Sequence, residues 1–164
     1  MKTSFKIALS GILLALSAGI SAAESLLPLP LGVKPGFSNI PVMFAIKELG
    51  VLPAFMIVLL KSFFVLLTRG VTAFIMSLSG GVLSFLIMVT LFKKTKLSTV
   101  FTSIMGSLAH NVGQTAAACV LMGSGAVLYY ASILIISGIT AGAVTGIIIS
   151  LILPVLEPFL RRKQ

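Results

Sequence analysis

The chain carries, from Leu97 to Met122, the stretch LSTVFTSIMGSLAHNVGQTAAACVLM. As a helix, this uncharged stretch is long enough to cross the roughly 30 Å of hydrocarbon in a bilayer. At its centre lie His110 (the only histidine of the chain), Asn111 and Gln114. Because residues three and four apart are neighbours on a helix surface, His110 and Gln114 share a face and Asn111 lies beside Gln114. Polar groups in hydrocarbon face a bundle interior, a cavity or a partner, so this cluster is the best lead to function.

The composition is that of a membrane protein. Of the 164 residues, 58% are apolar and 9% are charged, and the mean hydropathy is +1.20. Such a chain has room for a single membrane domain, residues 1–164, and none for a separate soluble catalytic domain. The net charge of +9 resides mainly at the ends of apolar runs. This pattern is typical of membrane topology and disfavours binding to nucleic acid.

Six apolar segments predict an all-α bundle of six transmembrane helices: 5–23, 38–51, 53–68, 71–92, 97–122 and 126–153. Basic clusters flank the first, fourth and sixth segments, at Lys2 and Lys6, at Lys93, Lys94 and Lys96, and at Arg161, Arg162 and Lys163. If every segment spans, the three clusters fall on one side, and both termini are cytoplasmic. Arg69 is the exception and is predicted to lie on the outer side.

The first segment has a second interpretation. A basic start, an apolar core and Ala22-Ala23 before Glu24 also fit a secretory signal. Its removal would leave five spans and reverse the side of the Lys93–Lys96 cluster, so we favour a transmembrane helix.

Small residues recur at every fourth position of this first segment: Gly11, Ala15, Gly19 and Ala23. Such a stripe lets another helix approach closely in lipid. It serves either packing within the chain's own bundle or docking to a partner subunit. The Ser and Gly residues of the fourth and sixth segments are interpreted as close helix packing.

Acidic residues are scarce: there is no Asp, and the only Glu residues are Glu24, Glu48 and Glu157. Carboxylate-pair chemistry and carboxylate-held magnesium therefore lack their ligands. No phosphate-binding loop and no metal-ligand spacing is present. We expect no enzyme activity, no cofactor and no metal. The single cysteine, Cys119, excludes an internal disulfide.

Residues 24–37 are predicted to form an outer loop. Four prolines between Glu24 and Pro41 prevent a continuous helix. The segment is too apolar for a solvated linker, so we expect it to cover a pocket. Ser38 or Asn39 is expected to cap the following helix.

Three motifs together resemble the Gx transporter family, often labelled heptaprenyl diphosphate synthase component I. They are the Gly-Val-Lys-Pro-Gly-Phe-Ser-Asn run from Gly32 to Asn39, Ser79-Gly80-Gly81-x-x-Ser84, and His110-Asn111-x-Gly113-Gln114. The resemblance covers nearly the whole chain, and the last motif is its most specific part. That family in turn resembles the substrate-binding (S) subunits of energy-coupling factor (ECF) transporters.

The resemblance implies a six-helix protein of the bacterial cell membrane that binds a vitamin-like molecule near the outer surface. Its partners would be a coupling subunit, docked on the small-residue stripe, and two ATPases. The synthase label fits poorly, because prenyl diphosphate synthases of the trans type hold magnesium with Asp-rich motifs and this chain has no Asp.

The substrate site is predicted from polar residues placed on the outer half of the bundle. The main set is Lys34, Asn39, Lys61, His110, Asn111 and Gln114, with Glu24, Arg69, Tyr129 and Tyr130 as additional candidates. The alternatives are structural. The His-Asn-Gln cluster would then be an interhelical hydrogen-bond set, Lys61 an internally paired or snorkelling cation, Lys34 a solvated loop residue, and the tyrosines interfacial anchors.

The leading hypothesis is therefore an ECF-type S subunit for a small vitamin-like or quinone- or isoprenoid-related molecule. The alternatives are a membrane scaffold or quinone- or flavin-associated component of an extracellular electron-transfer complex, and a non-catalytic accessory of prenyl diphosphate synthesis.

Overall fold

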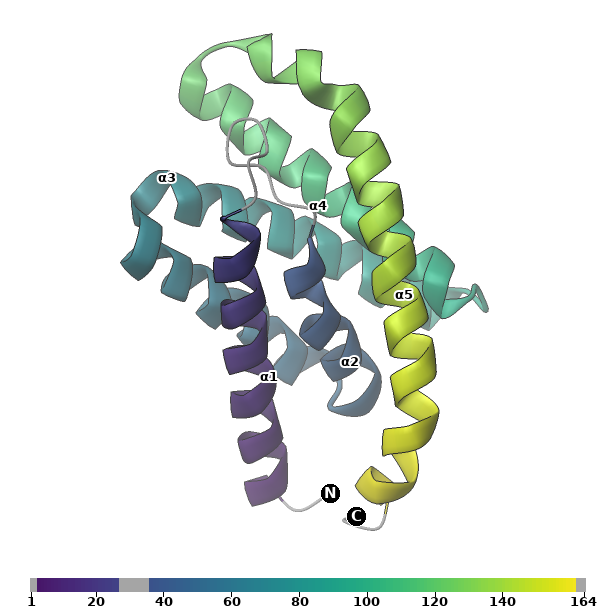
Figure 1. The fold of residues 1–164 in the computed structure, drawn as a ribbon. Coiled ribbons are helices and arrows are strands. Elements are labelled where there is room, and N and C mark those ends of the chain that lie inside the picture. The colour runs from purple at the N-terminus through teal and green to yellow at the C-terminus, as the bar shows by residue number, and fades with distance from the viewer. Residues whose placement is uncertain (1–2, 27–35, 162–164) are drawn as a thin grey trace.

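The computed structural model describes residues 3–26 and 36–161, except for the side chains of Ala126, Val127, Tyr130, Ala131 and Arg161. The described residues are all-α (Figure 1). The elements are α1 (Thr3–Glu24), the 3-10 turn η2 (Phe37–Asn39), α2 (Ile40–Glu48), α3 (Val51–Lys94), α4 (Thr99–Met122), the 3-10 turn η3 (Gly125–Tyr130) and α5 (Ala131–Arg161). Three helices are long and apolar enough to cross a membrane: α1, α3 and the Ser132–Leu160 part of α5. Their length and composition are those of a membrane protein.

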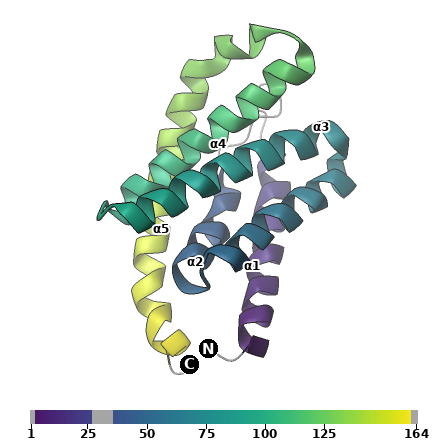
Figure 2. The ribbon, with the colours of Figure 1, turned by 180° about the vertical axis from the view of Figure 1, so that it is seen from behind.

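Helix α3 contains a sharp turn at Gly70, where φ is 81° and ψ is −176°. This left-handed backbone favours glycine, because a side chain would be strained there. The predicted segments 53–68 and 71–92 lie on either side of this turn, and the two halves fold back on each other (Figure 1 and Figure 2). The two separate helices predicted here are therefore two halves of α3 joined by a kink at Gly70.

Helix α2 is shorter than the segment 38–51 predicted for it. Its nine residues extend over about 14 Å at 1.5 Å per residue, which is too short to cross the hydrocarbon alone. Residues 41–46 are all buried, which makes α2 a core helix with no lipid-facing side. Val42, Met43 and Ala45 are fully buried in the main apolar cluster, which α1, α3 and α5 complete.

Glycines bring α4 very close to its two neighbours. A Cβ atom on Gly113 would lie 2.7 Å from the backbone oxygen of Ser79 in α3. A Cβ atom on Gly142 or Gly146 of α5 would lie 2.6 or 2.5 Å from a Cα atom of α4. A Cβ atom on Gly80, in the fourth segment, would likewise lie 2.7 Å from the backbone oxygen of His110. At these distances only glycine fits, which bears out close packing as the role of these glycines in the fourth and sixth segments.

Candidate functional site

Lys61 is the most unusual residue of the interior, because it is a lysine whose side chain is 0% exposed, in the apolar half of α3 that precedes Gly70. Its Nζ atom donates to Ser38 Oγ at 3.3 Å and to Asn39 Oδ1 at 3.2 Å. Placing a lone lysine at the centre of a membrane helix costs about 3 kcal/mol on insertion scales. These two hydrogen bonds offset part of that cost and tie α3 to the segment that precedes α2.

Glu24, the last residue of α1, binds the same segment through its backbone. Its Oε1 atom accepts from the backbone N–H of Gly36 at 2.7 Å and of Phe37 at 2.5 Å. Its Oε2 atom accepts from the N–H of Ser38 at 3.4 Å. The N–H groups at the start of a helical segment have no partner within the helix, and a carboxylate that accepts from them also complements the local dipole. Glu24 therefore serves as a cap from 12 residues upstream.

Two serines complete this arrangement. Ser17 Oγ of α1 donates to the backbone oxygen of Ser38 at 2.6 Å. Asn39 Nδ2 donates to Ser84 Oγ of α3 at 3.2 Å. We call this set of residues the polar hub: Ser17, Glu24, Gly36–Asn39, Lys61 and Ser84. Within it, irregular backbone lies deep in an apolar bundle with its polar groups held by side chains, the condition under which membrane proteins tolerate such backbone.

The capping role predicted for Ser38 or Asn39 is wrong. Asn39 occupies the N-cap position of α2 but makes no side-chain cap hydrogen bond. Its amide group instead joins Lys61 to Ser84. The side chain is committed to tertiary contacts because two buried partners on α3 lie within reach of it.

His110 and Gln114 of α4 lie next to the polar hub. Their side chains are each 2% exposed and are hydrogen bonded to each other, as expected for residues that share a helix face. A Cβ atom on Gly36 would be 3.7 Å from both Asn39 Nδ2 and the His110 ring. The histidine ring therefore lies directly beside the hub, and it is the positive φ of 97° that favours glycine at position 36. A Cβ atom on Gly80 would be 2.8 Å from Gln114 Cγ, so this glycine makes room for the glutamine.

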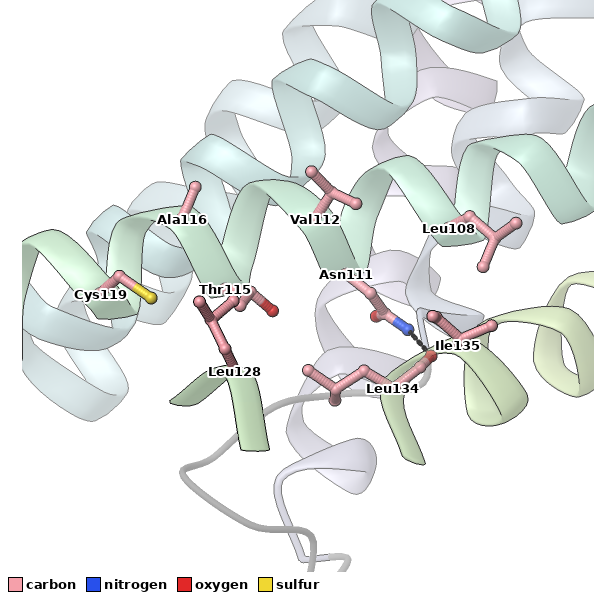
Figure 3. A pocket seen from close by; sticks show the side chains of 9 residues that line it. All are labelled: Leu108, Asn111, Val112, Thr115, Ala116, Cys119, Leu128, Leu134 and Ile135. Atoms are coloured by element: carbon pink, nitrogen blue, oxygen red, sulfur yellow. Dashed lines mark hydrogen bonds between the residues drawn. The ribbon is translucent and has the colours of Figure 1, made fainter. Parts of the chain in front are cut away.

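Asn111 does not join this group. It points toward the start of α5, where its Nδ2 atom donates to the backbone oxygen of Leu134 at 2.7 Å (Figure 3). Its side chain is 3% exposed, and its Oδ1 atom is buried without a hydrogen-bond partner among the described residues. It lines a cavity of about 280 Å³ between α4, η3 and α5. The cavity lining is Leu108, Asn111, Val112, Thr115, Ala116, Cys119, Leu128, Leu134 and Ile135.

The remaining predicted residues lie in several places. Arg69 donates from Nη2 to Ser21 Oγ at 3.5 Å, beside the end of α1. Tyr129 is 90% exposed on η3. Lys34 and the side chain of Tyr130 lie outside the described residues. The structure thus brings Glu24, Asn39, Lys61, His110 and Gln114 together, and Arg69 is close enough to Glu24 to interact with it electrostatically. It separates Asn111 and Tyr129 from them.

The small-residue stripe of α1 faces away from the described bundle. Gly11, Ala15, Gly19 and Ala23 are exposed. A Cβ atom on Gly11 or Gly19 would meet nothing within 4 Å. Among the described residues, no helix packs closely on Gly11 or Gly19, in contrast to the glycines of α5.

Three serines of the hub were not among the residues predicted for the site. Ser17 and Ser84 lie on apolar helices, and Ser38 was considered only as a cap. A hydroxyl that recurs among apolar residues is a weak signal, because many such serines bond their own helix, as Ser62 does to Val58. Ser84 was the easiest of the three to find, because it belongs to the Ser79–Ser84 motif.

Comparison with known proteins supports the resemblance seen in the motifs. A family model described as heptaprenyl diphosphate synthase component I matches residues 13–152. No curated protein and no solved structure matches the chain significantly. The matched region includes Ser17, Glu24, the Gly36–Asn39 segment and the cavity, so both candidate regions belong to the shared domain. The chain is therefore a member of the heptaprenyl diphosphate synthase component I family, also called the Gx transporter family.

Proposed function

We propose that this chain is the substrate-specificity subunit of an ECF-type uptake transporter. In this role it binds a small vitamin-like or quinone- or isoprenoid-related molecule from the outer side of a bacterial cell membrane. It performs no chemistry itself, and a separate coupling subunit with two ATPases supplies the energy.

The observation that carries the proposal is the polar hub. The segment Gly36–Asn39, which follows the proline-rich stretch of the sequence, lies in the apolar bundle and is held there by side chains from α1 and α3. Transport proteins bind their substrates where helices are interrupted at membrane depth. An ionisable residue inside a membrane bundle is by default a marker of such a site, and Lys61 is one.

Contacts between helix ends support six crossing segments with both termini on the cytoplasmic side, taking η2 and α2 together as the second. Lys47, at the end of α2, donates to Thr99 Oγ1 at the start of α4, at 2.6 Å. This contact joins the α2 end to the turn after the Lys93–Lys96 cluster, as the predicted topology requires. Arg69 contacts Ser21 near the end of α1, which is the outer side in the same topology.

The first turn of α1 and the last turn of α5 also lie at one end of the molecule in both views (Figure 1 and Figure 2). An even number of crossings would place them there.

The exposed stripe on α1 is the proposed docking surface for the coupling subunit. Small residues permit close helix contact in lipid, where hydrophobicity gives no driving force. A stripe exposed on its own bundle is available for that contact.

The test is co-purification from native membranes after mild extraction. We expect the tagged chain to recover a membrane coupling subunit and two ATPases. A Gly19→Leu variant should lose them, although a Cβ atom at this position meets nothing within 4 Å among the described residues. Thr140→Leu, which places the same leucine side chain at an exposed position of α5, is the control and should retain them.

Recovery of flavoprotein or quinone-linked subunits in place of the ATPases would overturn the proposal in favour of an electron-transfer scaffold. Recovery of a prenyl diphosphate synthase would favour the accessory role instead.

A further inference from the structure

We propose that the cavity between α4 and the start of α5 binds an uncharged, mainly apolar molecule that donates one hydrogen bond to Asn111 Oδ1 and enters sideways from the bilayer. The site lies apart from the polar hub, on the opposite side of α4 from the His110–Gln114 pair.

The orientation of the Asn111 amide follows from its partner. The backbone oxygen of Leu134 is an acceptor, so the group 2.7 Å from it must be the NH₂ of the amide. The amide oxygen is thereby turned away from the Leu134 backbone oxygen, toward the side on which the cavity residues Thr115 and Leu128 lie (Figure 3). Gly138 permits this approach, since a Cβ atom there would be 2.9 Å from Asn111 Nδ2.

The amide oxygen has no hydrogen-bond partner among the described residues, and it is buried. A buried polar atom without a partner costs about 1–3 kcal/mol. An N–H or O–H group of a ligand would remove this cost, whereas a carbonyl or ether oxygen would not. The site therefore selects a hydrogen-bond donor.

The rest of the cavity selects for apolar surface. None of its nine lining residues carries a charge, and most of them are aliphatic. An ionised ligand group would be desolvated there without a counter-charge, which is costly. A volume of about 280 Å³ suits a small molecule or one short chain.

The way in lies on the apolar perimeter of the bundle. Val112, Leu128 and Ile135 line the cavity and are 61%, 59% and 53% exposed. Neighbouring exposed residues of the same helices, Val120 and Ile136, are also apolar. A surface of this kind faces hydrocarbon, so the ligand reaches the cavity from the membrane.

This inference goes beyond the proposed function, because it assigns a second ligand site that is distinct from the polar hub. It does not rest on the transporter role, because binding is measured on the isolated chain. Binding without ATPase recovery would overturn the transporter role alone. ATPase recovery without binding would overturn the cavity assignment alone.

Cys119 provides the measurement, because it lines the cavity and is the only cysteine of the chain. The full chain in lipid nanodiscs is treated with N-ethylmaleimide, and the rate of Cys119 modification is followed by intact mass. The probes are decan-1-ol, methyl nonyl ether of the same length, and decanoate. Only the alcohol both donates a hydrogen bond and is uncharged.

We expect decan-1-ol to slow modification at least fivefold. One hydrogen bond is worth about 1 kcal/mol, so the ether should require an about fivefold higher concentration for the same protection. Decanoate should give none. In Asn111→Ala the alcohol and the ether should protect equally. In Ala116→Phe, which fills the cavity and leaves the Asn111 contact intact, protection should be lost.

The control for general bilayer effects is a chain with Cys119→Ser and Val120→Cys. It moves the thiol one residue along α4 to an 81% exposed position outside the cavity, and decan-1-ol should not slow its modification. Equal protection of the unmodified chain by alcohol and ether, protection by decanoate, or no protection at all would each overturn the inference. If Asn111→Ala does not fold, Ala116→Phe still decides whether the protection arises in the cavity.

Discussion

The amine of Lys61 and the amide oxygen of Asn39 lie 3.2 Å apart in the interior, where both side chains are buried. This contact joins the long helix α3 to the short segment that leads into α2. The Asn39 amide also donates to Ser84, on the other half of α3. One asparagine thus ties together both halves of the kinked helix, which makes the contact a structural centre of the bundle.

Replacing Lys61 by methionine tests how much this centre contributes. Lys61→Met keeps the length and apolar stem of the side chain but leaves Ser38 Oγ and Asn39 Oδ1 without their donor. Buried acceptors left in this way cost about 1–3 kcal/mol each. We expect a lower melting temperature in detergent, measured by size-exclusion chromatography after heating.

Lys93→Met, at an exposed position at the end of α3, is the matched control and should melt with the unmodified chain. If Lys61→Met also melts with the unmodified chain, the lysine does not stabilise the fold. Its retention would then be explained by ligand binding.

Glu24→Gln tests the cap on the hub. The carboxylate accepts from the backbone N–H groups of Gly36, Phe37 and Ser38 with two oxygens. Glutamine offers one uncharged oxygen and an NH₂ group that would face backbone donors. We expect faster amide hydrogen exchange in a peptide that covers residues 36–39, measured by mass spectrometry.

Thr140→Val is the control for that experiment, because the Thr140 hydroxyl bonds only to its own helix among the described contacts. It should leave exchange at residues 36–39 unchanged. Unchanged exchange in Glu24→Gln as well would mean that other contacts, such as the Ser17 hydrogen bond, suffice to hold the segment.

The helices were largely predictable from the sequence because apolar runs and their interruptions are local features. All six predicted segments correspond to helical segments, and the gap predicted between 53–68 and 71–92 falls at the Gly70 kink. The length of α2 was not predictable in the same way. A short run of apolar residues does not show where a buried helix begins and ends, and α2 itself has nine residues, with residues 41–46 buried.

The site was predictable where a helix period decides which residues share a face, as for His110 and Gln114. Asn111 was placed with them because it neighbours Gln114 on the helix surface. On α4, however, Asn111 lies between the face that packs on α3 and the face that packs on α5. Which of the two helices it contacts depends on how they pack, and the structure places it on α5. The role of Glu24 likewise depends on a contact 12 residues away, which no local pattern encodes.

Two glycines provide a test with opposite expected outcomes, one at the α3–α4 contact and one on the exposed side of α1. Gly113→Ala would place a Cβ atom 2.7 Å from the backbone oxygen of Ser79, which cannot move without shifting α3. Overpacking of this kind costs about 1–3 kcal/mol. Gly19→Ala adds the same methyl group to an exposed helix position that meets nothing within 4 Å. There the higher helix propensity of alanine should make the change neutral or stabilising.

We therefore expect Gly113→Ala to melt several degrees below the unmodified chain and Gly19→Ala to melt at or above it. Equal melting of the two variants would contradict the close approach of α3 and α4. Gly113 lies between Asn111 and Gln114 in the sequence. Equal melting would therefore also mean that the Gly113 contact does not fix the rotation of α4 about its own axis. The polar hub and the cavity depend on this rotation, since His110 must face the former while Asn111 faces the latter.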